Sequence, residues 1–171
     1  MRRFFEMFII RFVVYTYVFL FSVSLAPEAY MAVGRNFRFV DSYIAEINTP
    51  SYGNKTTKEI LDHFNTLGNN KAVFYEPKTV ASRPIYIREL EVIEGKENIV
   101  GQALPLWDKC EITLKKGLDY KTYHQVLLHE YLHCLGYTHS WDKNDLMYYS
   151  VNYVDETNVL KYAKEIEERN K

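Results

Sequence analysis

The sequence has few cysteines, almost no net charge and no repeat, and each absence narrows the possible functions. Its 171 residues include only two cysteines, Cys110 and Cys134, which form no CxxC pair, so no redox or cysteine-based zinc motif is indicated. The formal net charge of -1 gives no electrostatic reason to expect binding to nucleic acid or to an anionic membrane surface. No internal repeat or low-complexity linker follows Ala26, and the length suits one domain rather than two.

Residues 1–26 have the pattern of a targeting segment. Arg2 and Arg3 precede an apolar run, and its uncharged part, 12–26, is closer in length to a signal-peptide core than to a membrane span of about 20 residues. We expect a cleaved signal peptide or an uncleaved signal anchor, which places residues 27–171 outside the cytoplasm. Membrane contact is expected only through this segment. In an oxidising compartment the two cysteines could form one disulfide, and two buried thiols are the alternative.

The remaining chain predicts a mixed α+β domain with a twisted sheet of about five strands. Strand-like segments occur at 36–47, 71–76, 83–93, 98–106 and 109–116. Helical spacing predicts a backing helix after a cap at Thr57, an active-site helix from about Asp119 to Gly136, and a C-terminal helix after a cap at Asp155. The side chains expected to face the core are Ile60, Leu61, Phe64, Leu67, Ile85, Ile87, Leu90, Val159, Tyr162, Ala163 and Ile166.

One short segment, HEYLHCLGYTHS, contains three of the five histidines of the chain. His129 and His133 are four residues apart on the predicted helix, so their side chains differ by only about 40° around its axis and can reach one metal ion. Glu130 would lie beside that ion, where a general base could take a proton from a water molecule. Gly136 can adopt a positive φ and end the helix, which lets His139 return as a third ligand. The spacing therefore predicts one catalytic Zn²⁺ with these three histidines as its ligands.

The whole pattern, HExxHxxGxxH followed by a methionine, resembles the metzincin zinc peptidases, and the short "HS…LMY" spacing is most similar to their matrixin branch. The resemblance implies a metzincin-like catalytic domain that hydrolyses extended protein or peptide substrates, with Met147 in a turn beneath the imidazoles. It also implies that residues 151–153 line a specificity pocket. An edge strand containing VGQALP would bind the substrate backbone, through Gly101, Gln102, Ala103 and Leu104.

The chain departs from the matrixin pattern at Tyr149, two residues after the methionine, where matrixins usually have proline. Other metzincins have a tyrosine there that can contact zinc and assist the oxyanion, so Tyr149 is a second candidate catalytic residue, and a wall tyrosine is the alternative. The short segment 91–98 has no histidine, so the structural zinc and calcium sites of vertebrate matrixins are not expected. His63 and His124 lie outside the motif and are interpreted as ordinary helix histidines.

Two other classes of protein are compatible with the sequence. One is a zinc-containing surface or virion interaction protein that does not cleave peptides, and the other is a membrane-anchored adhesion protein that acts through its many aromatic side chains. Glu130 argues against the first, because a site that only binds zinc has no need for a base. We therefore expect a secreted or membrane-anchored zinc endopeptidase.

Overall fold

The computed structural model describes residues 41–93, 98–150 and 155–170, which form a mixed α+β domain. In chain order its elements are β1 (Ser42–Asn48), α3 (Gly53–Leu67), β2 (Arg83–Leu90), β3 (Gly101–Pro105), β4 (Cys110–Lys115), α4 (Tyr120–Cys134) and α5 (Glu156–Arg169). The predicted targeting segment and the predicted pocket residues 151–153 lie outside the described residues. Within the described ranges, no helix combines the length and the apolar character needed to cross a membrane.

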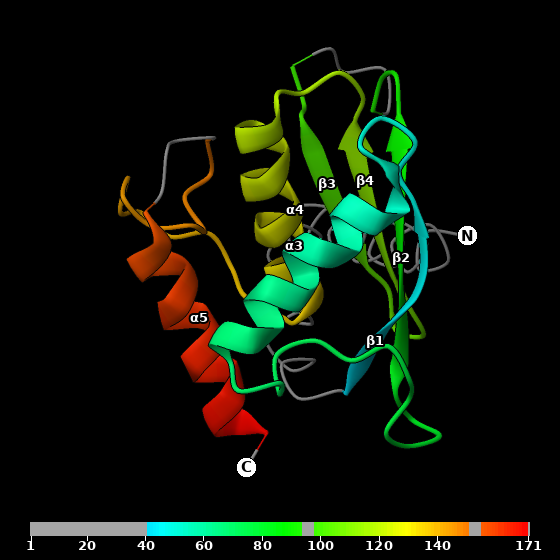
Figure 1. Cartoon of the computed structure of the whole chain (residues 1–171), viewed down its shortest axis with the longest axis vertical. Coiled ribbons are helices and arrows are strands. Elements are labelled where there is room, and N and C mark those ends of the chain that lie inside the picture. The colour runs from blue at the N-terminus through cyan, green and yellow to red at the C-terminus, as the bar shows by residue number, and fades with distance from the viewer. Residues whose placement is uncertain (1–40, 94–97, 151–154, 171) are drawn as a thin grey trace, which may run out of the picture. The chain divides into compact units, whose positions relative to one another are not determined.

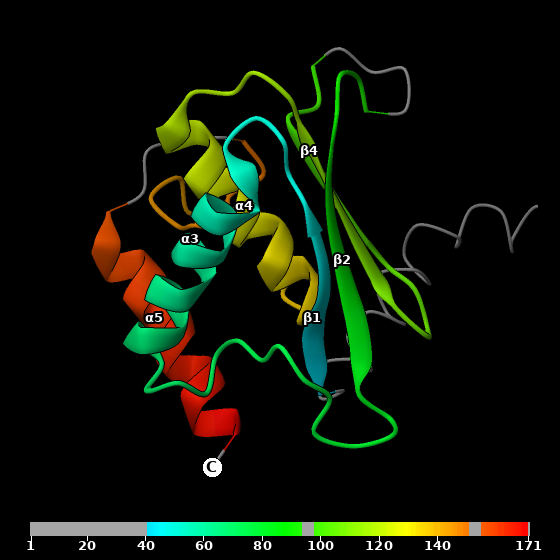
Figure 2. The ribbon, with the colours of Figure 1, turned by 45° about the vertical axis from the view of Figure 1, so that its right-hand side comes forward.

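The sheet has four strands in the order β1-β2-β4-β3. Strands β1, β2 and β4 run parallel, whereas β3 is antiparallel to β4 and forms one edge of the sheet. Figures 1 and 2 show the three helices on one side of the sheet, with α3 and α4 nearer to the strands and α5 beyond them. The α+β class is confirmed, and β3 is the edge strand that the VGQALP segment predicted.

The core lies where the alternation of the strands and the helical spacing predicted it. Ile85 and Ile87 of β2 are buried, as are Leu61 and Phe64 of α3. The apolar stripe of α5 is also buried as predicted, and consists of Val159, Tyr162, Ala163 and Ile166. Burial of each large side chain of this kind contributes roughly 1.5–3 kcal/mol to the free energy of folding. These contacts pack α3 against the sheet and α5 against α3.

The predicted fifth strand, at 71–76, is wrong. Two backbone N–H groups of this segment, at Ala72 and Val73, donate to the Asn65 side-chain oxygen over 3.0 and 2.9 Å. Among the described residues, a backbone bond between this segment and the sheet runs from the Ile44 N–H to the Phe74 carbonyl oxygen, at 2.7 Å. A side chain of α3 therefore takes the donors that a strand partner would have used, and the segment runs past β1 without forming a ladder.

Three local predictions also differ from the structure. Helix α3 begins at Gly53, so Thr57 lies inside it, and the buried Thr57 hydroxyl bonds the Tyr123 hydroxyl at 2.7 Å instead of capping the helix. Of the strand predicted at 36–47, Asp41 precedes β1, which begins at Ser42, and residues 36–40 lie outside the described residues. Leu90 is 39 % exposed, because the alternation of β2 turns Glu89 inward instead, where its carboxylate accepts a 2.9 Å bond from the Ser51 N–H.

The two cysteines form a disulfide that joins β4 to the last residue of α4. The Cα atoms of Cys110 and Cys134 are 5.7 Å apart. The buried guanidinium of Arg83 adds a second connection, because it donates to the carbonyl oxygens of Leu106 and Cys134 over 2.9 and 3.1 Å. The C-terminal end of α4 is thus held both covalently and by hydrogen bonds, directly before the turn that leads to the third histidine of the motif.

Candidate metal centre

Helix α4 begins and ends as the sequence predicted. The Asp119 side chain caps its first turn by accepting a 3.0 Å bond from the Thr122 N–H. At the other end Gly136 has φ of 87°, its N–H donates to the His133 carbonyl oxygen at 2.9 Å, and the Tyr137 N–H donates to the Leu132 carbonyl oxygen at 3.0 Å. This pair of bonds is a Schellman motif, which requires the left-handed conformation that glycine adopts without strain.

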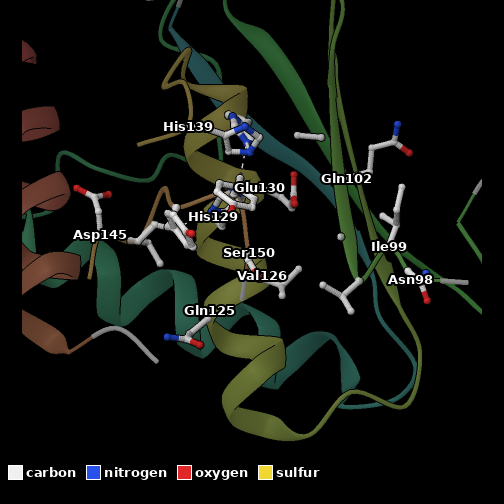
Figure 3. Close-up of a pocket in the computed structure, with 17 residues that line it drawn as sticks. Asn98, Ile99, Gln102, Gln125, Val126, His129, Glu130, His139, Asp145 and Ser150 are labelled. Carbon is white, nitrogen blue, oxygen red and sulfur yellow. Dashed lines mark hydrogen bonds between the residues drawn. The ribbon is translucent and has the colours of Figure 1, made fainter. Parts of the chain in front are cut away.

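The turn brings three imidazoles together. The Nε2 atom of His133 lies 3.1 Å from Nε2 of His129 and 3.1 Å from Nε2 of His139, and one ring nitrogen from each residue lies within 4.8 Å of the others. Figure 3 shows His129 and His139 close together beside α4, next to Glu130. The structure thus places the three predicted ligands around one point.

Two of the rings have a defined tautomer. His129 Nδ1 lies 2.7 Å from the Leu146 carbonyl oxygen, and His133 Nδ1 lies 2.8 Å from the Tyr137 carbonyl oxygen. A carbonyl oxygen can only accept, so each Nδ1 carries the proton and donates it. In a neutral imidazole the other nitrogen, Nε2, then has a free lone pair, and these lone pairs point into the cluster.

Burial keeps these imidazoles neutral. It lowers the pKa of His133 to about 4, with a further lowering from the charge of His129 and a partial opposing effect from the bond to the Tyr137 carbonyl. Burial also lowers the pKa of His129 and of His139. Neutral imidazole is the form that binds a metal ion.

The arrangement of the three rings is more favourable with a cation between their nitrogens than without one. Nε2 atoms of two neutral, Nδ1-protonated rings cannot hydrogen-bond each other, so the 3.1 Å approach of His129 to His133 places two acceptors together. A shared metal ion converts that repulsion into ligation, and three imidazole ligands leave a position open, as in catalytic zinc sites.

Glu130 lies beside the cluster and is in contact with the edge strand. Its side chain is only 7 % exposed, and burial raises the pKa of its carboxyl to about 8 against the opposing effect of a hydrogen bond from the Ala103 backbone. A Cβ atom at Gly101 would lie 2.9 Å from the Glu130 Oε1 atom and 3.1 Å from Cγ. Gly101 therefore lets β3 approach α4 closely enough for the strand to hold this carboxylate.

A cavity of about 580 Å³ joins the histidines to the edge strand. Among the predicted substrate-binding residues, Gly101, Gln102 and Ala103 line it, whereas Leu104 lies outside the lining. Tyr149 lines it too and is 62 % exposed. The described residues that line it are Asn98, Ile99, Val100, Gly101, Gln102, Ala103, Gln125, Val126, His129, Glu130, His133, His139, Asp145, Leu146, Tyr148, Tyr149 and Ser150, and none of these is a lysine or arginine.

Met147 is fully buried in the core, on the segment whose backbone bonds the region of the histidine cluster. Its carbonyl oxygen accepts a 2.7 Å bond from the N–H of Ser140, directly after the third histidine. The preceding residue, Leu146, supplies the carbonyl that orients the His129 ring. The turn around Met147 therefore supports two of the three candidate ligands through backbone hydrogen bonds, a function that the motif itself did not specify.

Asp145 anchors this turn to α5, and sequence reasoning missed it. The carboxylate is 5 % exposed and accepts hydrogen bonds from the Met147 N–H at 2.8 Å, the Tyr162 hydroxyl at 2.6 Å and the Lys161 ammonium at 2.9 Å. Burial raises the pKa of Asp145, but the hydrogen bonds from Tyr162, Met147 and Lys161 outweigh it and hold the pKa below its usual value. The resulting stabilisation is present above the pKa of the unfolded chain and is lost as the pH falls through the lowered pKa of the folded protein.

Replacing Tyr162 with phenylalanine should lower the free energy of unfolding by about 1–3 kcal/mol, because the buried Asp145 carboxylate then loses one of its donors. Urea denaturation would measure the change. Tyr86→Phe is the matched control, because its side chain is 37 % exposed and its hydroxyl can bond water in both states, so a change within about 0.5 kcal/mol is expected. Equal effects of the two substitutions would show that the Tyr162 hydroxyl does not hold the turn.

The two remaining histidines are apart from the cluster, as predicted. His63 is exposed on α3, with Nε2 3.3 Å from a carboxylate oxygen of Glu156 on α5. His124 is half-buried on α4, where its ring lies against Tyr120. Gln125 was not predicted as a site residue, although its position one helical turn before His129 could have indicated it.

Comparison with known proteins gives no independent indication of function. No protein-family model matches the chain, and no curated protein matches it.

Proposed function

We propose that the protein is a zinc-dependent endopeptidase with a metzincin-like, matrixin-type catalytic domain. One observation carries the proposal: three converging histidines adjoin a buried glutamate that an edge strand holds in the same cavity. A site that only stored or bound zinc would not need this carboxylate, and a structural zinc site would normally have four protein ligands.

The edge strand has the backbone geometry needed to bind an extended peptide. The Lys115 N–H donates to the Val100 carbonyl oxygen at 2.9 Å, and the Leu106 N–H donates to the Lys109 carbonyl oxygen at 2.8 Å. In an antiparallel pair, the residues whose backbone groups bond the partner strand alternate along the strand. Val100 bonds β4 and Leu106 bonds the residue directly before it, so the backbone N–H and C=O groups of the even-numbered residues of β3 point to β4, and those of Gly101 and Ala103 point away from it. The Ala103 N–H bonds Glu130, and the outward carbonyl groups remain for strand addition by a substrate.

The residues of the chain then divide the reaction between them. His129, His133 and His139 would hold the ion, which when bound supplies Lewis acidity that polarises the scissile carbonyl and makes water more acidic. Glu130 takes a proton from the attacking water and passes it to the leaving amine. Burial raises the pKa of this carboxyl, and a neighbouring cation would favour the ionised form that accepts a proton. Tyr149 is placed at the rim of the cavity, where it could donate to the oxyanion.

The proposed setting is outside the cytoplasm, either secreted or anchored by the N-terminal segment. The disulfide between Cys110 and Cys134 supports this location, because such bonds persist in oxidising compartments.

A peptide-library cleavage assay tests the function directly. Protein loaded with Zn²⁺ should hydrolyse internal bonds of peptides, and a chelator should stop hydrolysis until Zn²⁺ is restored. Zinc binding without cleavage of any library member would instead support the interaction-protein alternative. Cleavage that is unaffected by a chelator would contradict the role of the metal.

A further inference from the structure

The disulfide closes the segment of the chain that carries most of the candidate metal centre. It joins Cys110, the first residue of β4, to Cys134, the last residue of α4, across a sequence separation of 24. The segment between them contains His129, Glu130 and His133, and the turn that leads to the third histidine begins directly after it. Oxidation of the two thiols therefore acts on the part of the chain that supplies two proposed ligands and the proposed base.

The hydrogen bonds that shape the turn after α4 are local. The N–H groups of Gly136 and Tyr137 donate to carbonyl oxygens of the last helical turn, and the Tyr137 carbonyl oxygen accepts from Nδ1 of His133. These bonds set the shape of the turn, but they do not set its position relative to the sheet. The guanidinium of Arg83 and the disulfide connect this end of α4 to the strands.

A metal site binds more tightly when the fold holds its ligands in place before the ion arrives. The disulfide lies within the ligand set, because His133 is one residue before Cys134 and His139 is five residues after it. A cross-link reduces the conformational freedom that the open chain must lose on folding, and metal binding is coupled to the same equilibrium. Reduction of the bond should therefore lower the affinity for the ion, even where the fold persists.

Burial makes the change one-directional. Cys110 and Cys134 are 1 % and 0 % exposed, so the completed bond is shielded from reductants in solution. In a reducing compartment the same two residues stay as thiols. The state of this pair therefore depends on the compartment in which the chain folds.

We propose that oxidation of Cys110 and Cys134 is the maturation step that gives the three-histidine site its high affinity for a metal ion. The inference rests on the metal centre of the proposed function. In this step the two thiols lose two protons and two electrons and form one S–S bond, and a disulfide oxidant of the export compartment accepts them and is reduced to two thiols. The chain is then latent before export and binds its metal where the bond can form.

The zinc affinities of the oxidised and the reduced full chain test the inference. Competition with a chromophoric chelator should show about 10–100-fold tighter binding to the oxidised form, the range found when a supporting group of a metal site is lost. The double variant Cys110→Ala/Cys134→Ala should show the same weakening, and it has no thiol that could bind zinc in place of an imidazole. Circular dichroism at the measuring temperature establishes that each sample is folded.

Leu61→Ala separates this effect from a general loss of stability. The Leu61 side chain is fully buried on α3 and outside the cavity lining, so its truncation destabilises the fold while the disulfide remains. The oxidised Leu61→Ala protein should bind zinc within about twofold of the unaltered protein. A loss of affinity as large as that of the double variant would overturn the assignment, as would equal affinities of the oxidised and reduced forms.

The coupling must also act in the opposite direction, which gives a measurement that needs no variant. If oxidation raises the zinc affinity about tenfold, saturating zinc raises the equilibrium constant for disulfide formation about tenfold, which lowers the reduction potential of this two-electron couple by about 30 mV. A glutathione redox buffer in which a chelator fixes the free zinc concentration would measure this shift, and an unchanged equilibrium would contradict the maturation step.

The maturation step and the peptidase function can fail separately, because zinc binding does not require turnover. Tighter zinc binding by the oxidised form of a protein that cleaves no peptide would reject the peptidase function and keep the maturation step. Peptide cleavage combined with equal zinc affinities of the two redox forms would do the reverse.

Discussion

Replacing Glu130 with glutamine is expected to reduce kcat for peptide hydrolysis by about 10²–10⁴-fold while the protein keeps its metal. Glutamine has the same shape, and its carbonyl oxygen can still accept the bond from the Ala103 backbone, so the fold and the three histidines should be unaffected. What it lacks is a basic oxygen that can accept a proton from water. Steady-state kinetics together with metal analysis of the same sample would measure both effects.

A second buried glutamate provides the control for this substitution. Glu89 is also 7 % exposed, but it lies on β2, and its carboxylate accepts a bond from Ser51 outside the cavity lining. Glu89→Gln should therefore leave kcat within about twofold of the wild-type value, since a surrogate acceptor remains in place. Wild-type turnover by the Glu130 variant would refute the general-base assignment.

Removing the third imidazole, by His139→Ala, should weaken zinc binding by more than about 100-fold. Loss of a group that only orients a metal ligand costs about 10–100-fold in affinity, and loss of a ligand itself should cost more. His139 lies after the Gly136 turn rather than on α4, and its Nε2 is 3.1 Å from that of His133. Competition with a chromophoric chelator would give the affinity.

His63→Ala is the matched substitution, because this imidazole is on the exposed face of α3 and outside the histidine cluster. The zinc affinity of the His63→Ala variant should equal that of the unaltered protein. If the His139 variant retained full zinc stoichiometry against the chelator, the third ligand would have to be another group.

The sequence predicted the parts of the site that depend on local geometry. His129 and His133 share a helix face because of their spacing, and Gly136 ends that helix because its position requires a positive φ. Asp119 and Asp155 cap their helices for the same kind of local reason. A pattern of this type is visible in the sequence because each partner lies within one or two helical turns.

The remaining features depend on contacts between residues far apart in the chain. Asp145 bonds Tyr162 of α5 and Gly101 leaves room for Glu130, and no local pattern identifies either pair. The sequence named Cys110 and Cys134 as a possible disulfide, but only their contact in the fold decides against two separate buried thiols. The same limitation explains the incorrect fifth strand, where amide groups that a strand would use are taken by a side chain of α3.

The bonds of Asp145 also bear on the order in which the working site can form during synthesis. All three histidines precede residue 140, but the carboxylate that fixes the supporting turn needs donors from α5, the last helix described. A nascent chain that has released the histidine motif and not yet α5 would carry every candidate ligand without this anchor for the Leu146 and Met147 backbone. On this basis the supporting turn of the three-histidine cluster gains its anchor only when α5 has been synthesised, so the proposed metal centre would form late in synthesis.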